Sequence, residues 1–420
     1  MGLLLLLGPW LHAPQMAVAS PATALSVLRN EASYAFADSM TFELDSESGA
    51  VIDEIVLRFQ VDDEDVHNRR IPEFEPGRQV RAVHREPLPR GGLHPTAEVH
   101  WWWTIRDSEG NESVTDRQTL RYVDEQLEWT VLETADVRVW HHGLREAKAL
   151  ELAAMADRAI TALDELVGLR VDRRIEIVAY QRQADLRRAL ADRGATYESR
   201  LSTLGARVAD DTVVLDLGSS ADDLEEVVYH ELSHIVLHLH LGPEWVLVPS
   251  WLDEGLAMYA EGDLSGPERR TLDQALRNDE IISVRSLTAF PGDAGQVSLA
   301  YAQSQDLVAF LVEEHPRERF RGLLDRLVGG ETTFDEALAA EYGYDPLSMY
   351  QAYRAARGLD PAVVPVDGAR SQARSPISPQ PSTDAPAPRT APPCTGWLGL
   401  IVLAAVLLPS GMRRAREASN

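Results

Sequence analysis

The sequence predicts an α+β protein in which an all-β part precedes a mixed, largely helical part. Short strand-like segments separated by turn residues fill residues 20–134. From residue 135 to about 360, strands become fewer and the apolar residues take the helical period. Strands gathered early and helices gathered late are typical of the α+β class.

Five segments within residues 20–134 have the composition of strands. They alternate apolar and polar residues or run apolar, and turn residues such as SEGNE lie between them. The segments are 39–45, 51–59, 97–107, 118–124 and 127–133. Short strands at this spacing predict a β-sandwich of the immunoglobulin or fibronectin type. We expect the run of Trp101, Trp102 and Trp103 to belong to its core rather than to a ligand platform.

The second part, residues 135–360, contains segments with the two-residue period of strands and segments with the 3.6-residue period of helices. The expected elements are a helix at 144–169, a strand at 174–180, a helix at 184–194 and a strand at 211–218. A histidine-rich helix follows, and further helices continue to about residue 357.

The composition excludes some classes of protein and of site. Lys and Arg number 40 and Asp and Glu number 66, so the formal net charge is 40 − 66 = −26. Nucleic-acid binders need a basic surface for phosphates, so we expect no nucleic-acid partner. The single cysteine, Cys394, excludes an intrachain disulfide and a cysteine-based zinc site.

Both ends of the chain predict export and membrane attachment. Residues 1–19 hold a short apolar stretch and an A-x-A cleavage sequence, which predict a signal peptide. Residues 361–394 are rich in proline and have no aromatic residue, which predicts a disordered linker. Residues 395–412 suit a transmembrane helix, and the arginines of residues 413–420 predict a cytoplasmic tail. We therefore expect a single-pass protein of the cell membrane with its body outside the cytoplasm.

The histidine-rich helix, expected at 221–241, carries the chemistry. Acidic residues crowd its first turns, and a Gly-Pro pair ends it. Within it, an H-E-x-x-H motif is formed by His230, Glu231 and His234. Two histidines four residues apart lie on one helix face, where both can bind one zinc ion. Glu231 adjoins the first histidine, where a general base can take a proton from the attacking water.

A third zinc ligand is needed, and three later residues are candidates. His240 has the metzincin spacing, but that pattern has a glycine where this chain has Leu237. A helix that continues through this position carries His240 about 9 Å along the axis beyond His234. Glu254 and its neighbour Asp253 follow at a distance that lets a loop reverse direction and a second helix return a carboxylate to the metal.

Together, HELSH and the later WLDEGLAMY resemble the motifs of the gluzincin clan, which includes thermolysin and the zinc aminopeptidases. In the aminopeptidases the second motif runs W-L-N-E-G-F-A, and its Glu is the third ligand. Over roughly residues 30–357 the chain resembles bacterial peptidase-MA-like proteins, in which a β-sandwich precedes a gluzincin domain. The resemblance implies a thermolysin-like zinc peptidase domain with Zn²⁺ bound by His230, His234 and Glu254. It also implies that Glu231 is the general base.

Four further features bear on the site. No G-x-M-E-N-type exopeptidase motif is found, so aminopeptidase specificity is not implied. Tyr301 resembles the Tyr of the aminopeptidase motif Y-E-K-G, which opens a helix downstream of the Glu ligand and donates to the oxyanion. The strand at 212–217 resembles the edge strand on which gluzincins bind an extended substrate. His238 lies one turn beyond His234, and three histidines of a straight helix cannot reach one metal ion. We therefore expect His238 either to support the ligands from outside or to belong to the packed polar surface, and the sequence favours packing.

These features predict a membrane-anchored, extracytoplasmic zinc metallopeptidase that acts on peptides or proteins. Two alternatives stay open. A surface adhesin or binding protein would use the metal site structurally or keep it as a vestige. A metzincin-type peptidase would use His240 as the third ligand.

Overall fold

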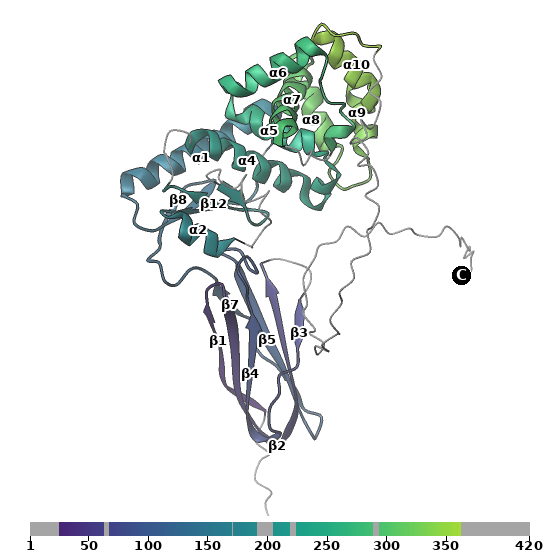
Figure 1. The fold of residues 1–420 in the computed structure, drawn as a ribbon. Coiled ribbons are helices and arrows are strands. Elements are labelled where there is room, and N and C mark those ends of the chain that lie inside the picture. The colour runs from purple at the N-terminus through teal and green to yellow at the C-terminus, as the bar shows by residue number, and fades with distance from the viewer. Residues whose placement is uncertain are drawn as a thin grey trace, which may run out of the picture. The chain divides into compact units, whose positions relative to one another are not determined.

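The computed structural model describes residues 25–62, 67–169, 171–190, 205–218, 224–288 and 294–362 (Figure 1). They belong to one unit of the chain. The predicted signal peptide, transmembrane helix and cytoplasmic tail lie outside these ranges, as does almost all of the predicted linker, so the membrane location stays a prediction. Within these ranges, no helix is long and apolar enough to cross a membrane.

The first sheet has seven strands, all paired antiparallel. They are β1 (Ser26–Ala35), β2 (Ser39–Val61), β3 (Asn68–Arg70), β4 (Gly77–Pro87), β5 (Glu98–Asp107), β6 (Glu112–Val114) and β7 (Gln118–Arg121). The first half of β2 pairs with β1 and β4, and its second half pairs with β3 and β5. The strands expected for a sandwich are thus joined through β2 into one hydrogen-bonded sheet, and the immunoglobulin or fibronectin type stays a prediction.

The tryptophans of β5 confirm the expected core position. Trp101 and Trp103 are 5% and 0% exposed, and both indole N–H groups donate to Oδ1 of Asn30, at 2.8 and 3.0 Å. Trp102 points to the opposite face, as the two-residue period of a strand requires, and the guanidinium of Arg117 lies over its ring. The run therefore builds the sheet rather than a separate binding platform.

The second sheet has the strand order β11-β12-β10-β9-β8. Its strands are β8 (Thr130–Glu133), β9 (Val137–His141), β10 (Ile175–Tyr180), β11 (Gly205–Arg207) and β12 (Thr212–Asp216). β10 runs parallel to β9 and β12, while the two edge strands, β8 and β11, pair antiparallel. Two expectations are corrected here. The strand expected at 127–133 in the first β part joins the second sheet as β8, and the strand expected at 212–217 is not an edge, because β11 covers its outer side.

The central strands of the second sheet are buried on both faces. In β10, Ile177 and Ala179 enter the core that the helices complete, whereas Val178 and Tyr180 enter the core that includes the first sheet. Burial on both faces explains why β10 and β12 carry runs of consecutive apolar residues, 177–179 and 213–215, rather than an alternating pattern.

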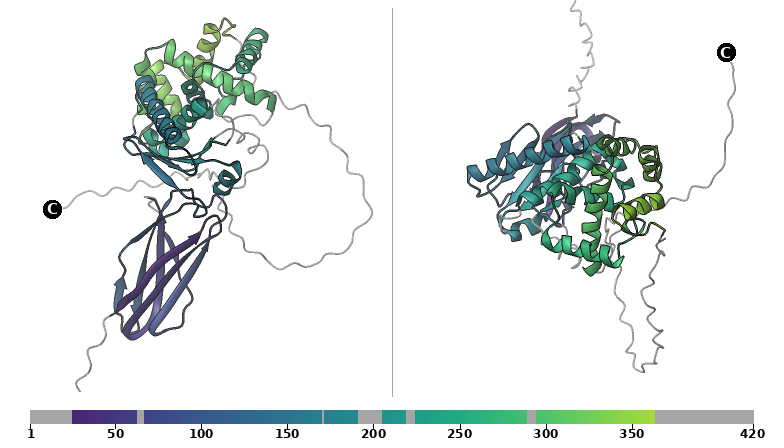
Figure 2. Two further views of the ribbon diagram at one scale, coloured as in Figure 1. Left: turned by 90° about the vertical axis from the view of Figure 1, so that its left-hand side faces the viewer. Right: turned by 90° about the horizontal axis from the view of Figure 1, so that it is seen from above.

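The helices gather mainly over one face of the second sheet (Figures 1 and 2). They are α1 (Glu146–Val167), α2 (Gln183–Ala189), α4 (Leu224–Leu241), α5 (Ser250–Glu261), α6 (Gly266–Asn278), α7 (Ala294–Glu313), α8 (Arg317–Asp325), α9 (Phe334–Tyr342) and α10 (Pro346–Ala356), with the 3₁₀ turns η2 (Gly242–Leu247) and η3 (Ser286–Thr288). α4 packs against α1, α5 and β11.

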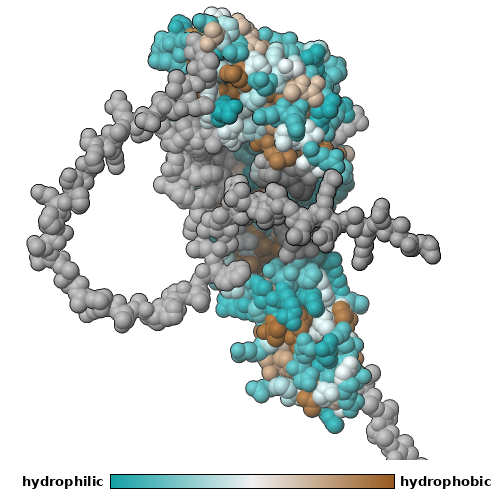
Figure 3. All heavy atoms as spheres, turned by 90° about the vertical axis from the view of Figure 1, so that its right-hand side faces the viewer, coloured by the Kyte–Doolittle hydropathy of each residue, from teal (hydrophilic) through white to brown (hydrophobic). Residues whose placement is uncertain are grey.

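The face drawn in Figure 3 is largely hydrophilic, with hydrophobic residues in small separate groups, as the acidic composition leads one to expect.

Candidate metal centre

Helix α4 continues past the position at which a metzincin chain turns. Leu237 is fully buried inside the helix, which ends four residues later at Leu241. Nε2 of His240 lies 3.1 Å from Oδ1 of Asp325 in α8. His240 is therefore directed to another helix and does not join the cluster described next, so the geometry gives no support to the metzincin alternative.

Helix α5 returns a carboxylate to the two histidines of the H-E-x-x-H motif. Nε2 of His230 lies 3.3 Å from Nε2 of His234, and Oε2 of Glu254 lies 3.7 Å from both nitrogens. Ligands of a tetrahedral zinc ion at 2.0–2.1 Å lie roughly 3.3 Å apart. Two imidazole nitrogens and one carboxylate oxygen are also donors that zinc prefers, so the metal group of His230, His234 and Glu254 fits this ion.

Each histidine of the metal group has a carboxylate on its other ring nitrogen. Nδ1 of His234 donates to Oδ1 of Asp253 at 2.7 Å, and Nδ1 of His230 donates to Glu261. These bonds fix the ring orientations and leave each Nε2 lone pair for a metal. Asp253, the alternative third ligand, thus lies on the far side of the His234 ring, and Glu254 is the carboxylate that faces both Nε2 atoms.

Glu261 was not predicted as a site residue. It lies seven residues after Glu254 in α5, so both carboxylates fall on the same face of the helix, two turns apart. That spacing is the signal available in the sequence. It becomes informative only once α5 is known to run beside α4.

His238 packs, as expected, and it also supports the site. It is 6% exposed, its ring stacks on Trp245 with centroids 4.4 Å apart, and its Nε2 lies 3.3 Å from Oδ2 of Asp253. The guanidinium of Arg207, from β11, lies over the same indole. Asp253 therefore holds two histidines of α4, one in the metal group and one packed behind it.

The charges around His234 act strongly on its protonation. Burial by itself disfavours the charged ring, but the carboxylates of Asp253 and Glu254 outweigh this effect and raise the pKa of His234 to about 10. Burial by itself would raise the pKa of Asp253, but its two histidine partners outweigh this effect and hold that pKa well below the usual range. Burial raises the pKa of Glu254. A metal and a proton therefore compete for Nε2 of His234.

Glu231 lies near the metal group. It follows His230 in α4, and its negative charge affects the pKa of both His234 and Glu254, so the carboxylate lies close to them. Across the described ranges, the Glu231 carboxylate has no hydrogen-bond or ion-pair partner. The side chains of His230 and Glu254 are 22% and 25% exposed, so the group is open to solvent.

The residue predicted to stabilise the oxyanion lies in α7. Tyr301 is partly buried and stands seven residues after the first residue of that helix, not at its start. Ser304, one turn further on, packs against Gly255, the neighbour of Glu254. Tyr301 is thus on the section of α7 that meets the section of α5 carrying Glu254, and its role stays a prediction.

The glycine of the WLDEG motif permits this close approach of two helices. A Cβ atom at Gly255 would lie 2.7 Å from the carbonyl carbon of Ser304 and 2.9 Å from Cγ2 of Val308. The first of these atoms belongs to the backbone and cannot move without moving α7. A glycine directly after Glu254 therefore sets the distance between α5 and α7.

We expect Gly255→Ala to destabilise the protein by about 1–3 kcal/mol, because overpacking forces the two helices apart. The free energy of unfolding in urea measures the effect. Gly266→Ala is the matched control, since its Cβ would meet only the end of the flexible Arg270 side chain, at 3.3 Å. Equal stability of the two variants would contradict the proposed role of Gly255.

Comparison with known proteins agrees with this geometry. Residues 155–356 match the model of the Peptidase MA superfamily. No curated protein matches the chain. Among solved structures, an M1 zinc metallopeptidase from Deinococcus radiodurans is similar at 14% identity and a TM-score of 0.38, covering 81% of this chain and 96% of its own. An aminopeptidase N family protein from Idiomarina loihiensis has 9% identity and a TM-score of 0.34, covering 73% and 71%. Both TM-scores are low, so the match of residues 155–356 carries the comparison.

Proposed function

Because residues 155–356 match the model of the Peptidase MA superfamily, we propose that this chain is a zinc metallopeptidase that hydrolyses peptide bonds in peptides or proteins. The observation that carries the proposal is the convergence of His230, His234 and Glu254 from two helices. These residues would hold Zn²⁺, which would polarise the scissile carbonyl and lower the pKa of a bound water.

The side chains around the metal group supply the proton transfers. Glu231 takes a proton from the attacking water and passes it to the leaving amine. Tyr301 donates a hydrogen bond to the oxyanion of the tetrahedral intermediate. Asp253 and Glu261 keep the two imidazole rings in the orientation and tautomer that the site needs.

The edge strand β11 suits an extended substrate. It pairs only with β12 among the described strands, and α4 packs beside it. A peptide that adds to this edge gains main-chain hydrogen bonds, which give affinity with little dependence on sequence. The substrate strand is therefore β11, three residues long, in place of the strand at 212–217 that the sequence indicated.

The number of ligands favours a catalytic over a structural metal. Structural zinc sites have four protein ligands, whereas catalytic sites have three and leave a position for water. The metal group has three members among the described residues. This count favours a peptidase over an adhesin with a structural metal.

We expect the purified protein to contain one zinc ion per chain and to cleave members of a mixed peptide library. A chelator should abolish cleavage, and added zinc should restore it. Elemental analysis and mass spectrometry of the products make the two measurements. A protein with its full zinc content and no cleavage of any peptide would support the adhesin instead, and a protein that binds no zinc would refute the zinc metallopeptidase.

A further inference from the structure

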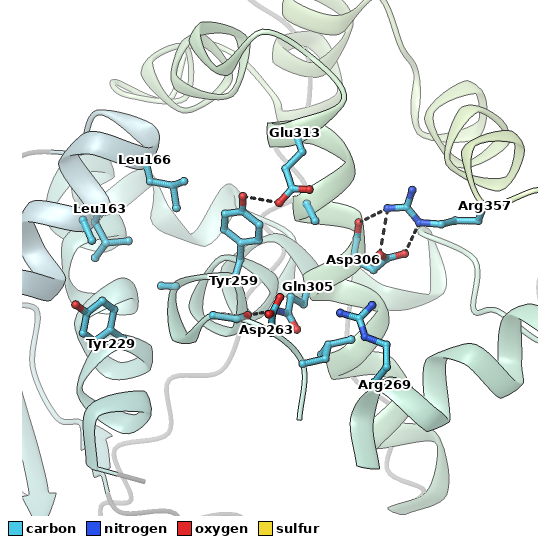
Figure 4. A pocket seen from close by; sticks show the side chains of 15 residues that line it. Leu163, Leu166, Tyr229, Tyr259, Asp263, Arg269, Gln305, Asp306, Glu313 and Arg357 are labelled. Carbon is cyan, nitrogen blue, oxygen red and sulfur yellow. Dashed lines mark hydrogen bonds and ion pairs between the residues drawn. The ribbon is translucent and has the colours of Figure 1, made fainter. Parts of the chain in front are cut away.

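A separate cavity of about 550 Å³ lies among α1, α4, α5 and α7 (Figure 4). None of the three residues of the metal group lines it, so it is not the site described above. Its volume is in the range of pockets that hold small organic molecules. The polar groups on its walls indicate which kind of molecule it suits.

Gln305, from α7, gives the first indication. Its side chain is 6% exposed and lines the cavity, and its Nε2 donates to the carbonyl of Gly262. That bond fixes the orientation of the amide and leaves Oε1 as the acceptor. Oε1 is buried and has no partner among the described residues. Buried acceptors in proteins are nearly always paired, so this atom points to a missing donor.

The charges of the cavity give the second indication. Asp306 pairs with Arg357 at 2.7 Å, and Glu313 accepts from the hydroxyl of Tyr259 at 2.9 Å. Asp263 and Arg269 also line the cavity, but neither side chain has a hydrogen bond or ion pair within the described ranges. One negative and one positive side chain are therefore available to a ligand.

One wall of the cavity is apolar. Leu163 and Leu166 of α1 form it, and Figure 4 shows them across the cavity from Arg269 and Asp306. Leu163 is only 1% exposed, so Leu166 supplies most of the apolar surface that an aliphatic group would cover. A matching ligand thus carries an ammonium group, a carboxylate and an aliphatic side chain.

We propose that this cavity binds an aliphatic amino acid or dipeptide as a zwitterion. Its carboxylate pairs with Arg269, and its ammonium group donates to Asp263 and to Oε1 of Gln305. The aliphatic side chain packs against Leu166. Binding itself does not depend on the proposed peptidase activity.

The location gives such binding a consequence that does rest on the proposed function. Gly262, held by Gln305, directly follows Glu261, which pairs with Nδ1 of His230. Tyr229, another lining residue, directly precedes His230. Amino acids and dipeptides are products of peptide hydrolysis, so the proposed ligand is a product of the proposed reaction. The cavity is then a product-binding site whose lining residues Gly262 and Tyr229 are the sequence neighbours of Glu261 and His230.

The test is calorimetric titration of the full-length protein with L-leucine and two analogues. Leucinol lacks the carboxylate and 4-methylpentanoate lacks the ammonium group, and we expect each to bind at least about tenfold more weakly than leucine. Arg269→Gln should weaken leucine binding by a similar factor and remove the difference between leucine and leucinol. Arg270→Gln, the same change at an exposed neighbour that does not line the cavity, should leave binding unchanged.

A second set of titrations uses protein from which a chelator has removed any metal. Leucine binding that survives chelation supports the cavity, and it does so whether or not the protein proves to be a peptidase. Binding that is lost with the metal and unchanged in Arg269→Gln would place the ligand at the metal group and overturn the proposal. So would the absence of leucine binding, or equal affinity for the three ligands.

Discussion

The Glu231→Gln variant is expected to lose about 10²–10⁴-fold in the rate of peptide hydrolysis while it keeps its zinc. The amide has nearly the shape of the carboxylate but cannot accept the proton of the attacking water. Glu231 is not a member of the metal group and has no hydrogen-bond partner among the described residues, so its replacement leaves the ligands and the fold in place. The ratio kcat/KM for a peptide found in the library screen, measured together with zinc content, checks the prediction.

Glu225→Gln is the matched control for this experiment. Glu225 lies on the same helix but is exposed, and its only described partner is the exposed Arg158, at 2.9 Å. We expect wild-type hydrolysis from this variant. Unchanged activity in Glu231→Gln would remove the general base from the mechanism, and a loss of zinc there would show that Glu231 supports the metal group instead.

The local part of the site could be predicted because it depends on one helix. His230 and His234 are four residues apart, so the helical period alone brings them to one face. The sequence also indicated that α4 ends at Gly242 and that the chain does not turn at Leu237. These features follow from the identity of nearby residues and need no tertiary contact.

The supporting carboxylates could not be predicted because they depend on how α5 packs on α4. Asp253 and Glu254 are adjacent in the sequence, yet the packing sends one to Nδ1 of His234 and the other to the metal side. The orientation of α5 about its own axis decides which of these two carboxylates faces the Nε2 atoms of the histidines. The resemblance to gluzincins answered it, whereas residue spacing alone left both open.

Sheet membership was missed for a similar reason. Strand composition correctly indicated β8 and β12, but the pairing partners of a strand lie far away in the sequence. β11, which covers the outer side of β12, has only three residues and so shows no periodicity. The residues that line the cavity beside Gln305 come from several helices, so no single segment of the sequence indicates that cavity.

Substitution of Glu254 is the second decisive experiment, because it tests the residue that completes the metal group. Glu254→Ala removes one of three ligands, so we expect a loss of zinc affinity beyond the about 10–100-fold that follows the loss of an outer partner. Asp253→Ala should fall within that smaller range, because Asp253 touches His234 only through Nδ1. Competition with a chromophoric chelator measures all affinities on the folded protein.

His240→Ala supplies the control that separates the two peptidase classes. The side chain of His240 is directed to Asp325 and shares no contact with the metal group, so zinc affinity should equal that of the wild type. The metzincin alternative requires the reverse pattern, in which His240→Ala loses zinc and Glu254→Ala keeps it. If Asp253→Ala lost as much affinity as Glu254→Ala, the assignment of one carboxylate to the metal and the other to the imidazole would be wrong. The order of the three affinities therefore tests the arrangement of α4 and α5 as well as the identity of the third ligand.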